Sequence, residues 1–506
     1  MSVDGAVQHV APQGTPKAVR NSTLSLVSQG LYAVLHLVSI AILARALGMA
    51  DFGRYFTIFA LVLVVQLAME LGLGTALTRR LAPQSTAANP TTAQAWGLFL
   101  WVALASALVL LAAGAAVDTF ISGRGHLRDF AFAAVACAAL QVQRFCTGVF
   151  RAFEVFAPEN IARILQGACF TLLLVATPLL QPVSLGSALA AFAASHVLAT
   201  AWLLAAYWRR WRFFGCSLSL AHAREWVREA VPVGIGDTVR GLTWQLDTVL
   251  LGWMRPAAEV GIYSVAYRPL GPLNWIPRAV TAATFTSFAR LAQTDRAQLA
   301  RSFSATVRVL WVVSLIPAVL FFVCAEAVVR TLAGAAYLEA VIPLRIVIWV
   351  ACFSFMSYPL GAMFAATGQP RLYARLAILT FSIELALEAL LIPFWGYLGA
   401  CFGSFTGELF FTAAGLALCR RQGLVRLEWH RLAGAALAAL AAGAALWPMR
   451  HLPLGWLSLA VAGSTLLYVA MCVALGALAR EEVTRLVQAI LKRVPAAAQQ
   501  ASRGAR

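Results

Sequence analysis

The sequence predicts an all-α membrane protein that crosses the bilayer about fourteen times. Of its 506 residues, 61% are hydrophobic and only 12% are charged, whereas a soluble domain carries about 25% charged residues. Several runs contain no charged side chain, among them residues 95–117 and 346–370, and these exceed the ~20 residues that span a hydrocarbon core. No alternating polar and apolar strand pattern is present, so the spans are expected to be helices. This composition excludes a soluble globular enzyme, a disordered chain and a disulfide scaffold.

The apolar segments follow one another along almost the whole chain, separated by short polar connections. Each is long enough to cross the membrane as a helix. An even number of crossings places both termini on the same side. The expected spans are residues 24–44, 55–77, 95–117, 130–150, 161–180, 187–207, 231–254, 260–289, 306–329, 342–366, 372–394, 397–419, 432–450 and 455–478.

The distribution of lysine and arginine predicts which side the termini occupy. The two tails, 1–23 and 479–506, together with the even-numbered connections carry 26 of the 39 Lys and Arg residues, whereas the odd-numbered connections carry 9. Positively charged loops remain in the cytoplasm, so both tails are expected there. The net charge of +18 is spread loop by loop. A nucleic-acid-binding surface would need it on one folded face, so we expect no nucleic-acid partner.

Motifs that bind cofactors or carry catalysis are missing from the sequence. It has no GxxxxGK[ST] phosphate-binding loop, no HExxH, no GxSxG and no CxxC among its nine cysteines, and each of these has a defined chemical role. We therefore expect no enzyme activity, no cofactor and no metal site.

Two halves of the chain repeat short patterns in the same order. Residues 51–55 (DFGRY) match 259–263 (EVGIY) at an offset of 208, and residues 78–82 (TRRLA) match 288–292 (FARLA) at an offset of 210. Six spans separate the copies, so both halves would have the same orientation. Parallel repeats of this kind occur in transporters.

The repeat predicts two six-helix lobes around a central cavity, with one helix pair appended. Residues 208–230, which contain five arginines and three tryptophans, are expected to be an amphipathic cytoplasmic linker on the membrane surface. The expected parts are an N-lobe at 24–207, the linker at 208–230, a C-lobe at 231–419 and spans 13 and 14 at 432–478.

Two segments carry a resemblance to a known family. Residues 42–48 (ILARALG) with 52–55 (FGRY), and residues 246–252 (LDTVLLG) with 260–268 (VGIYSVAYR), resemble the O-antigen and exopolysaccharide flippases of the multidrug/oligosaccharidyl-lipid/polysaccharide exporter superfamily. The resemblance covers residues 20–480. It implies a bacterial inner-membrane protein that turns undecaprenyl-pyrophosphate-linked oligosaccharides from the cytoplasmic to the periplasmic leaflet by alternating access.

Other functions remain open from the sequence. A cation-coupled multidrug extruder or a peptidoglycan-precursor lipid flippase would share the expected fold. A polysaccharide polymerase or ligase would need a long periplasmic loop, which the chain lacks. Besides the membrane and a lipid-linked oligosaccharide, the resemblance suggests a polysaccharide polymerase and a chain-length regulator as candidate partners.

Charged residues inside the expected spans require an explanation, because each costs at least ~2.5–3.5 kcal/mol on insertion scales. The seventh span holds Asp237, Arg240 and Asp247 on roughly one helical face. This face could line a water-filled cavity and relay protons or ions, or it could hold a structural ion pair. The resemblance falls on Asp247, which favours a functional role for that residue.

Arginines in other spans are candidates for binding a pyrophosphate, because a guanidinium group can bind phosphate through two parallel hydrogen bonds. Arg144 and Arg278 lie well within their spans and, with Arg240, are the preferred candidates for the cavity. Arg163 and Arg268 are weaker candidates, since both are close enough to span ends to reach the interface. Glu70 is the expected counter-charge.

The eleventh span carries Glu384 and Glu388, four residues apart on one helical face. Like charges at this spacing repel, so one glutamate could be protonated and couple transport to protons. An ion pair of the glutamates with Arg375 or with another span is the slightly preferred alternative. In the twelfth span, Gly399, Gly403 and Gly407 form a stripe beside Glu408 that is typical of close helix packing.

The charge distribution makes the topology testable. Reporter fusions at Ser122 and at Gln422 should report opposite sides of the membrane, with Gln422 cytoplasmic. If both fusions report the same side, the predicted topology is wrong.

Overall fold

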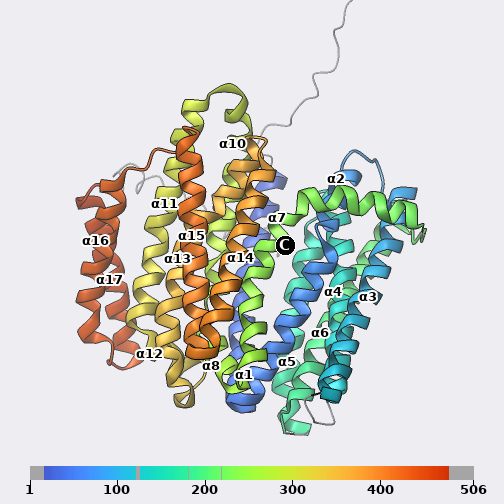
Figure 1. The fold of residues 1–506 in the computed structure, drawn as a ribbon, viewed down its shortest axis with the longest axis horizontal. Coiled ribbons are helices and arrows are strands. Elements are labelled where there is room, and N and C mark those ends of the chain that lie inside the picture. Colours follow the sequence, from blue (N-terminus) through green and yellow to red (C-terminus); the bar gives the residue numbers. More distant parts are fainter. Residues whose placement is uncertain (1–15, 121–125, 181, 218, 478–506) are drawn as a thin grey trace, which may run out of the picture. The chain divides into compact units, whose positions relative to one another are not determined.

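The computed structural model describes residues 16–120, 126–180, 182–217 and 219–477, and every regular element in these ranges is a helix (Figure 1). This confirms the predicted all-α class. The chain divides into two compact units, Met1–Gln245 and Leu246–Arg506, and the division lies within α7 (Leu220–Met254). The expected C-terminal tail and most of the N-terminal tail lie outside the described residues. The lobe limits expected from the repeat stay a prediction.

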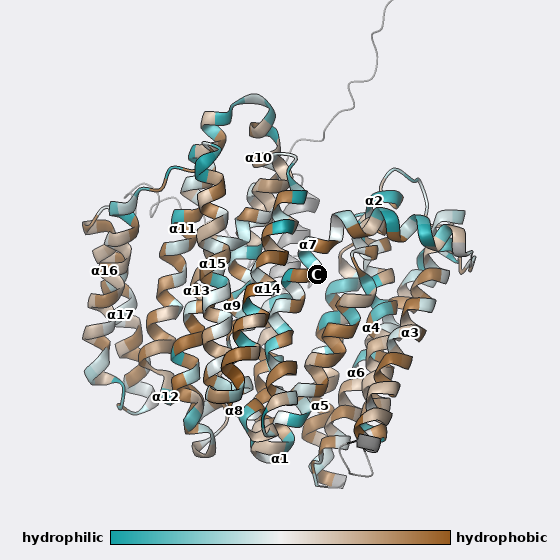
Figure 2. Ribbon diagram, in the orientation of Figure 1, coloured by the Kyte–Doolittle hydropathy of each residue, from teal (hydrophilic) through white to brown (hydrophobic). Residues whose placement is uncertain are grey.

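Most of the helices can cross a membrane. Among the described residues, eleven are long and apolar enough to do so, and apolar residues dominate their middle parts (Figure 2). One of them, Ser28–Glu70, contains two crossings, because Gly48 breaks it with a left-handed backbone (φ 71°). The more polar α7 and the segment from α8 to α10 occupy the positions of the seventh and eighth expected spans. The architecture is consistent with about fourteen spans.

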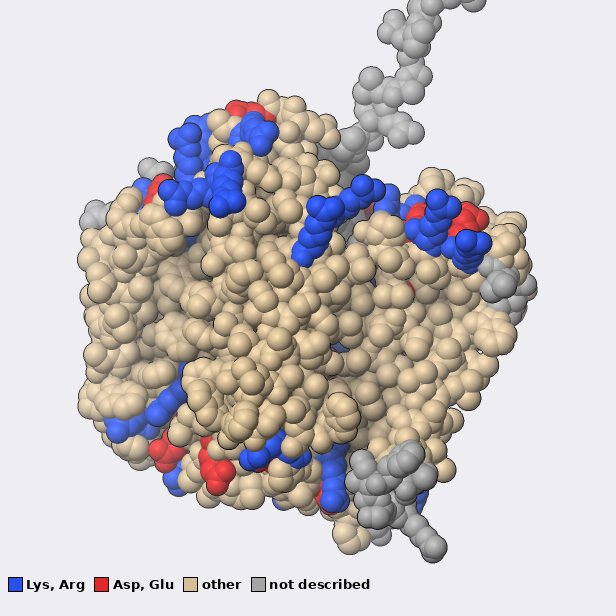
Figure 3. Space-filling view, viewed as in Figure 1, with Lys and Arg blue, Asp and Glu red and all other residues tan. Residues whose placement is uncertain are grey.

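Charged side chains on the molecular surface lie toward the helix ends. Figure 3 shows Lys, Arg, Asp and Glu gathered near the two ends of the helices, with a band between them that is almost free of charge. A hydrocarbon core imposes this distribution, because it offers charged groups no hydrogen-bond partners. The protein is therefore a multi-pass membrane protein.

The described part of the first unit contains six helices and the first part of α7. The expected second span, 55–77, is divided, because Leu71 and Gly72 have positive φ and separate two helices. The helices of this unit are α1 (Pro16–Glu70), α2 (Leu73–Leu81), α3 (Pro90–Phe120), α4 (His126–Ala152), α5 (Ala157–Leu180), α6 (Leu185–Trp211) and the first part of α7.

The second unit contains the remainder of α7 and the later helices. The chain is most broken between α8 and α10, where Pro269, Pro272 and Pro277 remove backbone donors within nine residues. Its elements are α8 (Ala257–Tyr267), α9 (Leu270–Leu273), α10 (Trp275–Thr294), α11 (Arg296–Val323), α12 (Ala325–Leu332), η1 (Ala335–Ala340), α13 (Val341–Ala366), α14 (Pro370–Trp395), α15 (Tyr397–Arg421), α16 (Trp429–Leu446), η2 (Trp447–Met449) and α17 (Leu454–Ala474).

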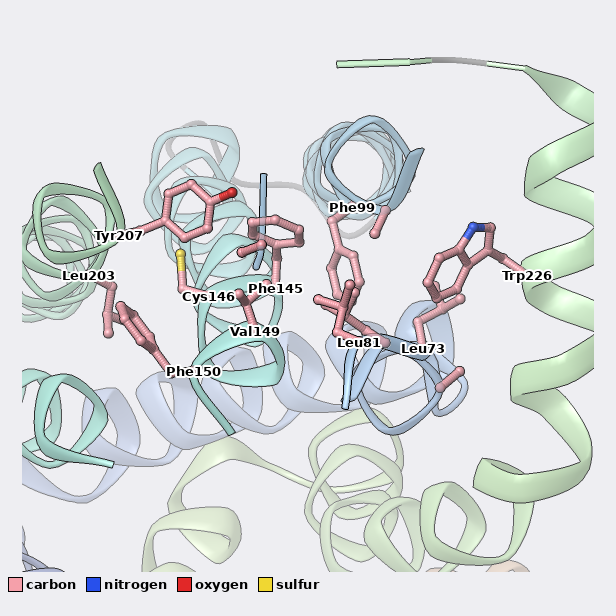
Figure 4. Close-up of a cluster of buried hydrophobic side chains, with 14 of the residues drawn as sticks. Leu73, Leu81, Phe99, Phe145, Cys146, Val149, Phe150, Leu203, Tyr207 and Trp226 are labelled. Atoms are coloured by element: carbon pink, nitrogen blue, oxygen red, sulfur yellow. The ribbon is translucent and has the colours of Figure 1, made fainter. Parts of the chain in front are cut away.

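The start of α7 is anchored to the first unit by a tryptophan. Trp226 is only 1% exposed and belongs to the same apolar cluster as Phe99, Phe145 and Tyr207 (Figure 4). The guanidinium of Arg80 at the end of α2 lies 4.4 Å from the Trp226 ring centroid. It also pairs with Glu225 at 2.7 Å and Glu229 at 2.6 Å. Residues 220–230 of the expected linker are therefore the first turns of a packed helix.

The turn between α1 and α2 touches α7 through two glycines. An added Cβ at Gly72 would lie 2.6 Å from the Cα of Gly234, and the φ of Gly72 is +82°. Only glycine suits this backbone conformation without strain, and only glycine lets the two main chains approach so closely. The contact fixes the end of α1, and with it Glu70, against α7.

Substituting Gly234 should weaken this contact. Gly234→Ala should destabilise the protein by ~1–3 kcal/mol through overpacking, lowering the unfolding temperature of the detergent-solubilised protein. Gly30→Ala on α1 is the matched control, because nothing lies within 4 Å of its added Cβ. Equal unfolding temperatures for the two variants would contradict the close approach.

Candidate functional site

Four carboxylates are buried inside the second unit. Asp247 of α7, Glu384 and Glu388 of α14 and Glu408 of α15 are 0%, 5%, 1% and 4% exposed. Burying charged carboxylates without compensation is very costly. Each therefore needs hydrogen-bond donors, a counter-charge or a proton.

Asp247 is held by hydroxyl and backbone donors. The backbone amide of Thr248 donates to its Oδ1 at 2.5 Å and the Thr248 hydroxyl donates to the same oxygen at 3.1 Å. The hydroxyl of Tyr263 on α8 donates to Oδ2. The Arg268 guanidinium acts on this carboxylate electrostatically. These hydrogen bonds compensate part of the free-energy cost of burying the carboxylate. They hold the Asp247 side chain in the interior of the second unit.

The glycine stripe on α15 makes room for the two glutamates of α14. An added Cβ at Gly407 would lie 2.5 Å from Oε2 of Glu384, and one at Gly403 would collide with the side chain of Glu388. The hydroxyl of Ser404 donates to Glu388 at 3.4 Å. The stripe therefore packs two helices closely, as its spacing predicts, and it does so around buried carboxylates.

Glu408 completes the cluster, and its role was missed from the sequence. The hydroxyl of Ser357 on α13 donates to its Oε1 at 2.6 Å. Asp247, Glu384, Glu388 and Glu408 all lie close enough to Tyr267 to act on it electrostatically. Ionised carboxylates that share a buried region repel one another, and loss of charge on one of them relieves that repulsion. We call these four residues the acidic cluster; its chemistry suits proton uptake and release.

A second charged group lies in the first unit, where α1, α4 and α5 meet. Arg144 Nε lies 3.3 Å from Oε2 of Glu70, and the Gln66 amide donates to the same oxygen at 2.7 Å. Glu159 accepts two hydrogen bonds from Arg151, at 2.9 and 2.6 Å.

These pairs are joined into one set by Arg163 and by longer-range electrostatics. Arg163 lies 3.0 Å from Glu159. Arg144 also acts electrostatically on Glu159, and Glu70 acts on Arg151. We call Arg144, Arg151, Arg163, Glu70 and Glu159 the arginine network.

The arginine network has more positive than negative groups. Three guanidiniums face two carboxylates, so one positive charge is left over. The side chains of Arg144 and Arg151 are 42% and 49% exposed, whereas those of Glu70 and Glu159 are 12% and 11% exposed. The guanidiniums are thus accessible and the carboxylates support them from beneath. Arg151 and Glu159 were missed from the sequence, although the spacing of Glu159 and Arg163 at i, i+4 is a detectable signal.

Three further candidates are Asp237, Arg240 and Arg278. Asp237 is exposed and Arg240 is partly buried, one turn apart on α7 in the first unit. Arg278 of α10 is exposed in the second unit. Its Nε donates to the Tyr358 hydroxyl at 3.0 Å, and its guanidinium lies 5.6 Å from that ring's centroid. Among the described residues, no group of three His, Cys, Asp or Glu side chains is placed to hold a metal ion.

Comparison with known families finds one match over more than half of the chain. Residues 18–291 match the family described as polysaccharide biosynthesis protein. No curated protein matches the chain.

Solved transporters share the fold at low sequence identity. Lipid II flippase MurJ in an inward closed conformation superposes with a TM-score of 0.72 at 11% identity, covering 89% of this chain and 98% of that chain. An inward-facing multidrug resistance MATE family transporter gives 0.62 at 16% identity, covering 79% and 98%. A MOP superfamily transporter from Pyrococcus furiosus gives 0.58 at 16% identity, covering 80% and 95%. The fold is that of the MATE and MurJ transporters.

Proposed function

Because the chain belongs to the polysaccharide biosynthesis protein family, we propose that it is a flippase for undecaprenyl-pyrophosphate-linked oligosaccharides. It turns these units from the cytoplasmic to the periplasmic leaflet of a bacterial inner membrane, for O-antigen or exopolysaccharide synthesis, by alternating access. The fold supports this proposal, since one protein that shares it is named a lipid II flippase. A polysaccharide polymerase and a chain-length regulator are the partners that such a product requires.

The arginine network is the observation that carries the proposal. Its excess positive charge and its accessible Arg144 and Arg151 suit a pyrophosphate, which guanidinium groups bind through paired hydrogen bonds. The network lies at the end of α4 that the charge distribution assigns to the cytoplasm, where the lipid-linked unit is loaded. Arg163 supports the site by sharing Glu159.

Arg240 and Arg278 are the further arginines proposed to contact the substrate, with Asp237 as a polar neighbour of Arg240. Arg278 is exposed and is oriented by Tyr358. Both are proposed to bind the pyrophosphate through the same kind of guanidinium contact as Arg144. Arg268 has a different role in this scheme, because it acts on buried Asp247.

The acidic cluster is proposed to couple transport to protons. Asp247, Glu384 and Glu388 are buried within the second unit, so they would change charge without touching the sugar. Uptake of a proton removes repulsion within the cluster and lets α14 and α15 pack in a different arrangement. Glu70 would link the same response to the arginine network through its pair with Arg144.

Replacing the substrate arginines tests the binding mechanism. Arg144→Ala, Arg240→Ala and Arg278→Ala should each abolish most polysaccharide export in a complementation assay at equal membrane abundance. The Lys variants should recover only part of it, because lysine is a point charge without the paired geometry. Arg330→Ala is the control, since Arg330 pairs with Glu326 on the exposed end of α12. Full export by all three Ala variants would refute the cationic mechanism.

Coupling is tested in proteoliposomes by following translocation of the lipid-linked oligosaccharide with and without a pH gradient. The pH gradient should increase the rate at which the native protein translocates the lipid-linked oligosaccharide. Asp247→Asn and Glu388→Gln should lose this acceleration while retaining the rate seen without a gradient, because the neutral side chains cannot exchange a proton. Glu326→Gln is the control, because the Glu326 side chain is 41% exposed on α12. A native protein indifferent to the gradient, or variants that respond normally, would contradict proton coupling.

A further inference from the structure

An apolar groove runs along the outer surface of the second unit, between α11, α13 and α16. It has a volume of about 470 Å³ and is lined only by apolar, aromatic and glycine residues. Figure 1 shows α16 beside α11 at the edge of this unit. The walls include Trp311, Leu315 and Phe322 of α11, Trp349 of α13, Gly443 of α16 and Trp447 of η2.

The groove exists because small residues of α16 face large aromatic and aliphatic residues of α11. Ala436, Gly443 and Ala444 face α11 across the groove, and an added Cβ at Gly443 would only just reach Val319, at 3.5 Å. At the far end the indole of Trp311 donates to the backbone oxygen of Leu432 at 3.2 Å, which closes the groove. The space is therefore a slot with one closed end.

The length of the slot matches one leaflet of a bilayer. Trp311 lies near the middle of α11 (Arg296–Val323) and Val323 is its last residue, so the lining runs for about 18 Å at 1.5 Å per residue. Half of the hydrocarbon core is about 15 Å. The slot is thus about as long as one leaflet is thick, and its open end at Val323 and Trp447 lies near the interface that the charge distribution assigns to the external side.

Two arginines meet at the open end of the slot. Arg345 and Arg450 lie 5.4 and 4.2 Å from the ring centroid of Trp447. Each also donates to a backbone oxygen, Arg345 to Phe322 at 3.1 Å and Arg450 to Trp447 at 2.9 Å. Within the described part of the chain, no Asp or Glu forms an ion pair with either of them. Two guanidiniums without acidic partners, fixed on an interfacial tryptophan, form a site for an anionic headgroup.

We propose that this slot binds one anionic phospholipid. An acyl chain fills the groove, and the phosphate lies against Arg345 and Arg450. The length supports this occupant, because an acyl chain spans one leaflet whereas a polyprenyl chain is several times longer than the slot. The site is separate from the arginine network and from the acidic cluster, and it stabilises the position of α16 against α11.

The proposal is tested by native mass spectrometry of the intact protein extracted in mild detergent. The mass spectrum shows whether a lipid is retained, and lipid analysis identifies it. The native protein should retain one anionic phospholipid. Ala436→Leu with Gly443→Leu should lose it, because the leucines fill the slot, while Ala445→Leu on an exposed part of the same helix should retain it.

The arginines are tested by titrating phosphatidylglycerol into delipidated protein. Arg345→Gln and Arg450→Gln should each weaken binding about fivefold. Arg345→Lys and Arg450→Lys should retain part of it, and Arg330→Gln should have no effect. A retained polyprenyl lipid, a retained zwitterionic lipid, or binding unchanged by the filled slot would overturn the proposal.

Discussion

The absence of hydrogen-bond partners in a hydrocarbon core is the constraint on which this structure depends. It requires that backbone groups pair within the same segment, so every described regular element is a helix. It also limits where a helix can break. The interruptions at Gly48, Leu71 to Gly72 and Pro269 to Pro277 need compensation from neighbouring protein, and the contact of Gly72 with Gly234 shows how closely a neighbour can approach.

The same constraint sorts the charges into two kinds of place. Arg151 of the arginine network and the arginines at Trp447 lie near helix ends. Carboxylates tolerate deeper positions, because hydroxyl donors such as Tyr263 and Ser357 surround them and because they can take up a proton. The proposed flippase mechanism would use both: a positive surface that meets the headgroup, and a buried group whose charge can change.

Small residues allow these polar groups to exist inside the bundle. Gly403 and Gly407 leave the volume that Glu388 and Glu384 occupy, and the small residues of α16 leave the slot beside α11. Glycine and alanine are common at helix contacts in membranes because they permit close packing. Here they also create space, in one case for carboxylates and in the other for a lipid chain.

The class, the approximate number of spans and the family resemblance follow from the sequence alone, because hydropathy and short motifs are local properties. The glycine stripe of α15 is equally local, and close packing was predicted correctly from it. Tertiary structure decided which partners these elements meet: Glu408 with Ser357, Arg151 with Glu159, and Trp226 in a core instead of at a lipid surface. Sequence reasoning misses such contacts because, in a membrane, the lipid-facing and the packed faces of a helix are both apolar. Hydrophobic periodicity therefore does not reveal which face turns inward, and residues more than a hundred positions apart, such as Asp247 and Glu388, come together only when the helices pack.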